Sequence, residues 1–331
     1  MTEPRPAAPA PQPQPVIGEQ SPAAIFLVAA ITEGGDPVTR QVLADASGLA
    51  RSVALRVPGA GLELVVAVGS DAWDRLFPGP RPAQLRPFRE VRGARHVAPA
   101  TPGDLLFHIR AMSHDACFEL AHRITQRLAG AATVVEEVHG FRYLESRDLI
   151  GFVDGTGNPT GRAALAAVTV GDEDPPFAGG SYVHVQRYVH DLAAWEALPV
   201  AEQERVVGRT KPDDTEMPPA VRPANSHTAL TSITDADGTD LEIVRANLAY
   251  GRAGGEKGTY FIGYSRDPAV TERMLRNMVV GDPPGNHDRL LDFSTAVTGT
   301  AFFAPSATFL ERPPSPGQCP GSTQAVSRPS T

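Results

Sequence analysis

The sequence predicts an α+β protein made of two domains of similar plan, each with an antiparallel sheet and helices packed against it. The 331 residues of the chain are enough for two cores of ordinary size. Strand-like and helix-like segments alternate along most of this length, with short connections between them. Pro-rich segments at residues 1–22 and 312–331 lack this pattern and bound the part that is expected to fold.

The two terminal segments are expected to be disordered. Residues 1–22 contain seven prolines among Ala and Gln, which favours an extended, mobile leader. Residues 312–331 contain few core-forming side chains. A solubilising tail is the simple interpretation of both segments, and a docking segment for a partner is the alternative for the C-terminal one.

Residues 23–140 are interpreted as the N-terminal domain. Its predicted elements are a strand over 24–31, a helix over 36–55, a strand over 62–68, a short helix over 70–77, a strand over 104–112, a helix from 113 and a strand over 133–138. Asp36-Pro37 is a typical helix start, with Asp as the cap. Cys117 falls on the apolar face of the later helix and is expected in the core. The order β-α-β-β-α-β predicts a ferredoxin-like unit.

Residues 141–311 repeat this theme less regularly and are interpreted as the C-terminal domain. Strands are predicted over 181–188, 241–250, 259–265 and 298–303, and helices over 192–198, 200–207 and 267–280. Gly208 is a predicted helix stop and Asp267-Pro268 a helix start. The cleft between the two domains is the expected ligand site.

Composition excludes several classes of function. A formal net charge of −8 without a block of Lys or Arg argues against a nucleic-acid partner. The two cysteines, Cys117 and Cys319, predict neither a disulfide framework nor a Cys-based metal site. The sequence shows neither a secretory signal pattern nor an apolar run long enough for a membrane span, so a cytoplasmic location is expected.

A glycine-rich stretch over residues 151–159 is the strongest candidate for an active-site loop. Gly151, Gly155 and Gly157 surround Asp154, and glycine lets backbone lie close to a bound group. The neighbouring Phe152 and Val153 would desolvate the carboxylate and raise its pKa. An Asx turn that merely joins two elements is the alternative.

Two further sites stand out in the second half. His227 lies at a predicted helix start among small residues, and one histidine is sufficient to ligate a haem iron, whereas structural zinc needs several ligands. Arg245 and Asn247 lie two positions apart on a predicted strand, so their side chains share one face of it. There they would meet an anion or a polar ligand. The alternatives are a satisfied core histidine and an exposed sheet face.

Together these segments resemble the dye-decolourising peroxidases, most closely their B-type bacterial branch. The resemblance covers residues 24–308 and rests on four motifs in order: Gly-Phe-Val-Asp-Gly at 151–155, Asn-Ser-His-Thr-Ala at 225–229, Arg-Ala-Asn at 245–247 and Leu-Asp-Phe-Ser-Thr at 291–295. One departure is Gly157, where many relatives carry Glu.

The resemblance implies haem b held between two ferredoxin-like domains, with His227 as the iron ligand. It implies that Asp154, Arg245 and Asn247 form the distal, catalytic side, and that the residues beside the cofactor are His227, Asp154, Gly155, Thr156, Arg245 and Asp292. Asp292 is expected to hydrogen-bond the other ring nitrogen of His227, with Asp288 as the possible substitute.

The implied activity is that of a peroxidase that forms a ferryl intermediate with hydrogen peroxide and oxidises dyes, phenols or Mn(II) in one-electron steps. A haem-binding or haem-handling protein with little turnover is the alternative, and an acid and a cation on the open face of the iron argue against it. Asp154 also argues against a chlorite dismutase. The expected partners are peroxide and a small-molecule reductant, without nucleic acid or membrane, and the chain is expected to be a homo-oligomer. The C-terminal tail lacks a Gly-Ser-Leu type of cargo sequence, so packaging in an encapsulin shell is not expected.

Overall fold

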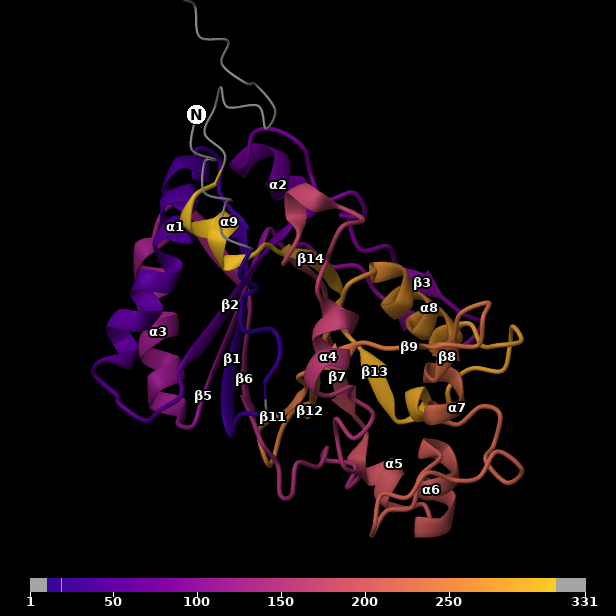
Figure 1. Cartoon of the computed structure of the whole chain (residues 1–331). Helices are drawn as coiled ribbons and strands as arrows, with labels where there is room; N and C mark the ends of the chain where they lie inside the picture. The colour runs from indigo at the N-terminus through magenta and orange to yellow at the C-terminus, as the bar shows by residue number, and fades with distance from the viewer. Residues whose placement is uncertain (1–10, 19, 314–331) are drawn as a thin grey trace, which may run out of the picture.

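The computed structural model describes residues 11–18 and 20–313, in which strands from both halves of the chain join in one antiparallel sheet (Figure 1). The sheet order is β10-β12-β11-β6-β1-β5-β2-β14-β7-β13. Because β12 also pairs with β7, the sheet closes into a barrel. Its strands are β1 (Ala23–Ile31), β2 (Glu63–Gly69), β5 (Leu105–Ala111), β6 (Ala132–Phe141), β7 (Ser181–His190), β10 (Val244–Arg245), β11 (Leu248–Gly251), β12 (Lys257–Ser265), β13 (Ser294–Ala296) and β14 (Thr300–Ala304).

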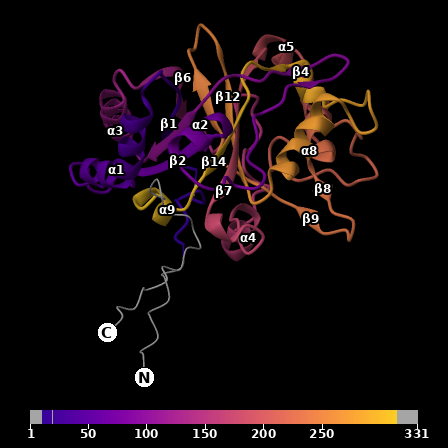
Figure 2. The ribbon, with the colours of Figure 1, turned by 90° about the horizontal axis from the view of Figure 1, so that it is seen from above.

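Helices cover the sheet on two sides, as Figures 1 and 2 show. One side carries α1 (Asp36–Ala54) and α3 (His114–Arg127), with α2 (Ser70–Leu76) and α9 (Ala307–Glu311) near them. The other side carries α7 (His227–Thr231) and α8 (Pro268–Val279), with α5 (Leu192–Glu196) and α6 (Val200–Val207) close to α7. The smaller elements are the hairpins β3 (Val91–Arg92) with β4 (Val97–Ala98) and β8 (Ile233–Thr234) with β9 (Asp240–Leu241), helix α4 (Gly161–Val168), and the 3₁₀ turns η1 (Pro175–Phe177) and η2 (Arg289–Asp292).

Side-chain alternation along β1 explains why this strand is an almost continuous apolar run. Ile25 and Leu27 pack in the cluster that includes the apolar faces of α1 and α3. Phe26 faces the barrel interior, where its ring stacks on Tyr260 with the ring centroids 4.3 Å apart. Since both faces of the strand are buried, both sets of positions must be apolar.

Most predicted elements are confirmed, with small shifts at their ends. Gly208 is in the left-handed conformation that stops α6, and Asp267 caps α8 by accepting from the Ala269 N–H. Asp36 is the first residue of α1 and pairs with Arg75 at 2.6 Å, so its expected role as the cap is wrong. Cys117 is buried in the core as predicted, and burial raises the pKa of its thiol to about 12.

Two local predictions need correction. The strand expected over residues 241–250 is divided into β9, which pairs with β8 in a separate hairpin, and β10 and β11, between which the side chain of Asn247 accepts from the Ile262 N–H at 3.1 Å. The β3–β4 hairpin, in the Pro-rich connection, was not predicted because its strands are only two residues long.

The sheet is a single barrel, whereas the sequence predicted a separate sheet for each domain. The mixed α+β class and the antiparallel pairing are confirmed. Strands β6 and β11 pair at one junction and β2 and β14 at the other, so the two halves share a continuous hydrogen-bond ladder. The division into domains at residues 140 and 141 stays a prediction.

The expectation that all of residues 1–22 are disordered is wrong for residues 11–18. The side chain of Gln14 is buried, donates to the carbonyl oxygens of Val66 (2.7 Å) and Pro305 (2.8 Å), and accepts from the Val66 N–H (2.8 Å). Val16 is buried with the barrel interior. The expectations for residues 1–10 and 314–331 lie outside the described residues.

Candidate functional site

A cavity of about 1040 Å³, including the space open to solvent, gathers most of the predicted site residues. Its walls come from the loop after β6, from β7, β10 and β12, and from α7, α8 and η2, so the lining residues run from Asp148 to Ser294. The cavity thus lies within the C-terminal half, and the prediction that the ligand site is a cleft between the two halves is wrong. The barrel interior is filled by large side chains such as Phe26 and Tyr260, and the space lies on the outer face of the C-terminal half instead.

His227 is the first residue of α7, at the position that the sequence predicted. Ser226 caps this short helix by accepting from the Ala229 N–H at 3.4 Å, which fixes where His227 leaves the backbone. The Nδ1 atom of His227 lies 2.7 Å from Oδ2 of Asp288, and its side chain lines the cavity. Because a carboxylate only accepts hydrogen bonds, Nδ1 carries the proton and Nε2 keeps a free lone pair.

Asp288 is the carboxylate that orients His227, so the sequence prediction that favoured Asp292 is corrected to its stated alternative. Asp288 is fully buried, and its Oδ1 accepts from the Leu290 N–H at 2.9 Å, which caps η2. Both of its oxygens are thus used, one by the turn and one by the imidazole. Asp292 lies at the other end of η2, with its Oδ1 3.0 Å from His96 Nε2.

Asp154 lies in the glycine-rich loop and lines the cavity as predicted. Its backbone N–H donates to the Ser146 carbonyl oxygen at 2.8 Å, and the Asn247 amide donates to its Oδ1 at 3.2 Å. Burial raises the pKa of the Asp154 carboxyl above its ordinary range, and the charge of Asp148 raises it further, while Arg245 and Asn247 act against this rise. The carboxyl therefore holds a proton more readily than an exposed aspartate does.

Arg245 and Asn247 also line the cavity, as their shared strand face predicted. Asn158 holds the Arg245 backbone from both sides, since its Oδ1 accepts from the Arg245 N–H at 3.0 Å and its Nδ2 donates to the Arg245 carbonyl oxygen at 2.7 Å. Within residues 11–18 and 20–313, the Arg245 guanidinium forms no ion pair. Its charge is therefore available to an anionic or polar ligand in the cavity.

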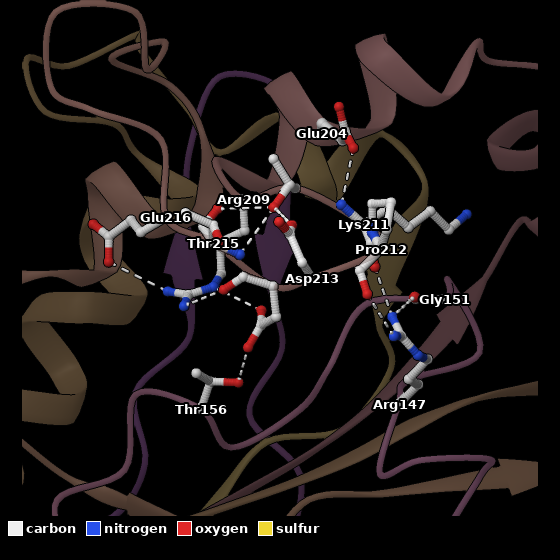
Figure 3. Close-up of polar contacts among 12 residues, drawn as sticks. Arg147, Gly151, Thr156, Glu204, Arg209, Lys211, Pro212, Asp213, Thr215 and Glu216 are labelled. Atoms are coloured by element: carbon white, nitrogen blue, oxygen red, sulfur yellow. Dashed lines mark hydrogen bonds and ion pairs between the residues drawn. The ribbon is translucent and has the colours of Figure 1, made fainter.

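The segment over residues 209–216 supports the glycine-rich loop from outside (Figure 3). Arg147 donates from Nη1 to the carbonyl oxygens of Gly151 and Lys211, at 2.8 Å in each case. Gly151 has a φ of +90°, and a Cβ at this position would lie 2.5 Å from Cε of Lys211. Only glycine fits this close approach without strain, so the loop and segment 209–216 hold each other in place.

Gly155 and Thr156 lie outside the lining that the described residues form around the cavity. Gly155 turns the chain with a φ of +83°, and the Thr156 hydroxyl donates to the Asp214 carboxylate in segment 209–216 (Figure 3). Their direct contact with a cofactor stays a prediction. Their observed role is to shape and anchor the loop that carries Asp154.

A second polar group in the cavity was not singled out from the sequence. The Nδ1 atom of His190 lies 2.9 Å from the Ser294 hydroxyl, and its Nε2 atom lies 3.2 Å from one carboxylate oxygen of Asp148. The other oxygen of Asp148 accepts from the Thr259 hydroxyl. Asp148 lies six residues before Asp154, but its local sequence does not distinguish it from an ordinary aspartate in a loop. The pairing of β7 with β12 and with β13 brings His190, Thr259 and Ser294 together, and the loop after β6 adds Asp148.

The remaining walls are mainly apolar, and this combination suits a flat, hydrophobic cofactor with one metal ion. The apolar lining side chains are Ile150, Phe152, Val153, Tyr188, Val207, Ile243, Phe261, Met274, Leu275, Met278, Leu290 and Leu291. His227 would supply one imidazole nitrogen to the iron, and Arg245 offers a cation. The donor set thus fits haem, for which a single strong protein ligand suffices.

Comparison with protein families matches almost the entire described chain. The family described as "Dyp-type peroxidase, N-terminal" matches residues 13–142, and "Dyp-type peroxidase, C-terminal" matches residues 145–309. A dye-decolorizing peroxidase from Rhodococcus erythropolis is 62% identical over 91% of this chain and 89% of its own length. One from Mycobacterium tuberculosis is 61% identical over 93% of this chain and 92% of its own length.

Solved structures agree with these sequence matches. The encapsulated DyP-type peroxidase from Mycobacterium smegmatis is 60% identical, with a TM-score of 0.91 over 92% of this chain and 99% of that chain. A variant of the DypB from Rhodococcus jostii RHA1 in complex with heme is 51% identical, with a TM-score of 0.89 over 91% of this chain and 98% of that chain.

Proposed function

The chain belongs to the Dyp-type peroxidase family, and from this membership we propose how its own residues perform the reaction. It is a haem-dependent peroxidase of the dye-decolorizing type. Bound haem supplies the redox-active iron at which hydrogen peroxide is reduced and which then withdraws electrons from a reductant. The protein holds the group, admits peroxide and moves protons.

We propose that His227 holds the iron through Nε2. The hydrogen bond from Nδ1 to Asp288 gives the ring the tautomer and orientation that this role requires, and it makes the ligating nitrogen more basic. The apolar walls of the cavity would cover the faces of the porphyrin. The 2.7 Å contact between His227 and a fully buried carboxylate is the observation that carries this assignment.

On the peroxide side, we propose that Asp154 carries the proton. It would accept a proton from one peroxide oxygen and return it to the other, which leaves as water. Arg245 would stabilise the negative charge that builds up on the departing oxygen. Asn247 would aim Asp154, because its own amide is oriented by the Ile262 N–H and presents Nδ2 to the carboxylate.

The alternative of a haem-handling protein with little turnover is not supported by this arrangement. A carrier has no need of an acid with a raised pKa next to a cation that lacks a carboxylate partner among the described residues. For the reductant, we propose dyes, phenols and Mn(II). A solved structure of a DypB variant, described as "in complex with manganese", is 51% identical to this chain, with a TM-score of 0.89.

We also propose that the barrel consists of two ferredoxin-like halves. The strand order is β6-β1-β5-β2 in the first half and β11-β12-β7-β14 in the second, and each half has helices on its outer face. When the four strands of each half are counted in chain order, the first strand pairs with the third on one side and with the fourth on the other. This order supports the ferredoxin-like plan.

Location and assembly remain proposals. None of the described helices is long and apolar enough to span a membrane. A cytoplasmic location and a homo-oligomer stay predictions. The Mycobacterium smegmatis relative was solved as an encapsulated peroxidase. The expected absence of shell packaging for this chain rests on residues 312–331, most of which lie outside the described residues.

The assignment of His227 is tested by His227→Ala. We expect loss of stable haem binding, or a displaced and inactive cofactor, since the other imidazole among the described lining residues, His190, is already engaged by Ser294 and Asp148. The measurement is the haem-to-protein ratio and the Soret band, with and without one equivalent of peroxide. His122→Ala, which removes an exposed imidazole from α3, is the control. Full haem occupancy with an unchanged spectrum and turnover in His227→Ala would overturn the assignment.

A further inference from the structure

A second cluster of metal-ligating side chains consists of described residues that do not line the cavity. It consists of His96, His287 and Asp292, which each offer one ligand atom, with all three atoms within 4.8 Å of one another. His96 Nε2 lies 3.0 Å and His287 Nε2 lies 3.2 Å from the same atom, Oδ1 of Asp292. No part of the peroxidase mechanism above uses these residues.

The backbone holds the three side chains in place although His96 and Asp292 are 196 positions apart in the sequence. His96 stands in the turn of the β3–β4 hairpin, which the bond from the Gly93 N–H to the His96 carbonyl oxygen closes at 2.9 Å. The hairpin lies tightly against the end of α8, since a Cβ on Gly93 would be 2.0 Å from the Val279 carbonyl oxygen. The segment with His287 is tied to the same helix, because the Asp288 N–H donates to the Met278 carbonyl oxygen at 2.9 Å.

We propose that His96, His287 and Asp292 bind a divalent first-row transition-metal ion at this junction. Two imidazole nitrogens and one carboxylate oxygen form a donor set that suits such ions, whereas Mg²⁺ and Ca²⁺ prefer oxygen ligands alone. A neutral imidazole needs only a change of tautomer to present the Nε2 lone pair. The three side chains are 20%, 16% and 25% exposed, which leaves the remaining coordination positions open to water.

The ligand atoms need to move little. Zinc binds imidazole nitrogen and carboxylate oxygen at about 2.0–2.2 Å, so its ligand atoms lie at most about 4 Å apart. The present atoms lie within 4.8 Å of one another, so a small contraction around the ion completes the site. The bound ion would then fasten the β3–β4 hairpin of the first half to the segment that also carries Asp288.

Arg95 is the one cation at the cluster among the described residues, and it competes with a metal ion. Its Nη2 lies 3.8 Å from Oδ1 of Asp292, but its side chain is 66% exposed and so is free to turn into solvent. Without a metal ion, the cluster is a set of hydrogen bonds around one carboxylate. This arrangement predicts opposite results for Arg95 and for the two histidines in a binding experiment.

The experiment uses the full, haem-loaded chain and Zn²⁺ as the probe, with binding followed by titration calorimetry. We expect a site of one Zn²⁺ per chain that His96→Ala weakens by more than the 10- to roughly 100-fold that loss of an outer-shell partner costs. Asp292→Asn should weaken it similarly, and Arg95→Ala should tighten it. His122→Ala is the matched control and should change nothing. Anomalous diffraction at the zinc edge should place the ion between the three side chains. Zinc and iron have well-separated absorption edges, so the two metals can be distinguished.

Two results would overturn the proposal. One is that the wild-type protein has no Zn²⁺ site that is lost in the His96→Ala variant. The other is a zinc signal placed elsewhere, or an affinity that both His96→Ala and Asp292→Asn leave unchanged. Because the Soret band reports His227 and its haem independently, an intact Soret band in the His96 variant distinguishes loss of this site from loss of the fold.

Discussion

At the scale of single residues, neighbouring groups fix which atoms of His227 and Asn247 are available to a ligand or to another side chain in the cavity. Asp288 accepts a hydrogen bond from Nδ1–H of His227, which leaves Nε2 as the nitrogen that can bind a ligand. The side-chain Oδ1 of Asn247 accepts from the Ile262 N–H, so that Nδ2 of the same amide faces Asp154. These pairs make the site specific before any ligand enters it.

The division of labour between Asp154 and Arg245 predicts different pH profiles for their variants. Charge stabilisation is needed at every pH, so Arg245→Leu should slow the reaction with peroxide across the whole range, by about 10² to 10³. Asp154 accepts a proton only when ionised, and because its pKa is raised, the wild-type rate should fall as pH drops through that raised value. Asp154→Ala should lose about 10² to 10⁴ above that pKa and recover as pH rises and peroxide itself ionises.

Stopped-flow mixing with peroxide, followed at the Soret band from acidic to alkaline pH, measures both profiles. Arg142→Leu, which removes an exposed arginine outside the cavity, is the control and should match the wild type. If Asp154→Ala were the slower variant at every pH while Arg245→Leu reacted almost normally, the two roles would be reversed.

At the scale of elements, the glycine-rich loop and segment 209–216 are held together by hydrogen bonds and a close approach of the backbone. The shape of the loop depends on positive φ angles at Gly151 and Gly155 and on the contacts of Arg147 and Thr156 (Figure 3). The position of Asp154 is therefore set by residues that do not contact a substrate.

Gly151→Ala should lower the free energy of unfolding by about 1–3 kcal/mol, because alanine is strained at a φ of +90° and its Cβ would displace the Lys211 side chain. Urea denaturation measures this loss. Gly254→Ala is the control, since its added Cβ meets no atom within 4 Å and its φ is not in the left-handed region. Equal stability of the two variants would show that the loop relaxes freely.

At the scale of the whole molecule, closure of the barrel decides where a ligand can bind. The interior is filled by side chains from both halves, such as Phe26, Tyr260 and Phe302, so the cavity forms between the outer face of β7 and β12 and the helices α7 and α8. The N-terminal leader takes part in this closure through Gln14, which bonds to β2 of the first half and to Pro305 of the second.

Gln14→Ala should destabilise the protein by about 3 kcal/mol, because it leaves three buried backbone contacts, to Val66 and Pro305, without their partner. The Soret band of the folded protein should stay unchanged, since Gln14 does not line the cavity. Thermal and urea unfolding test this, with Gln12→Ala as the control because the Gln12 side chain is exposed. A Gln14 variant as stable as the control would mean that water replaces the amide without loss.

The sequence by itself determined the elements and the chemical groups. Helix starts and stops such as Asp267-Pro268 and Gly208 act through neighbouring backbone, and the apolar periodicity of β1 reflects which faces are buried. For the same reason, the motifs around Asp154, His227, Arg245 and Asn247 identified the family and its cofactor.

Only the tertiary structure decided between Asp288 and Asp292, closed the two halves into one barrel and moved the cavity out of the interface between them. Asp288 and Asp292 are both acids at the ends of one short turn, and which of them meets His227 depends on how η2 packs against α7. The pairings of β6 with β11 and of β2 with β14 join strands far apart in the chain. Such long-range contacts leave no periodic signal in the local sequence, because they depend on the partner strand as much as on the strand itself.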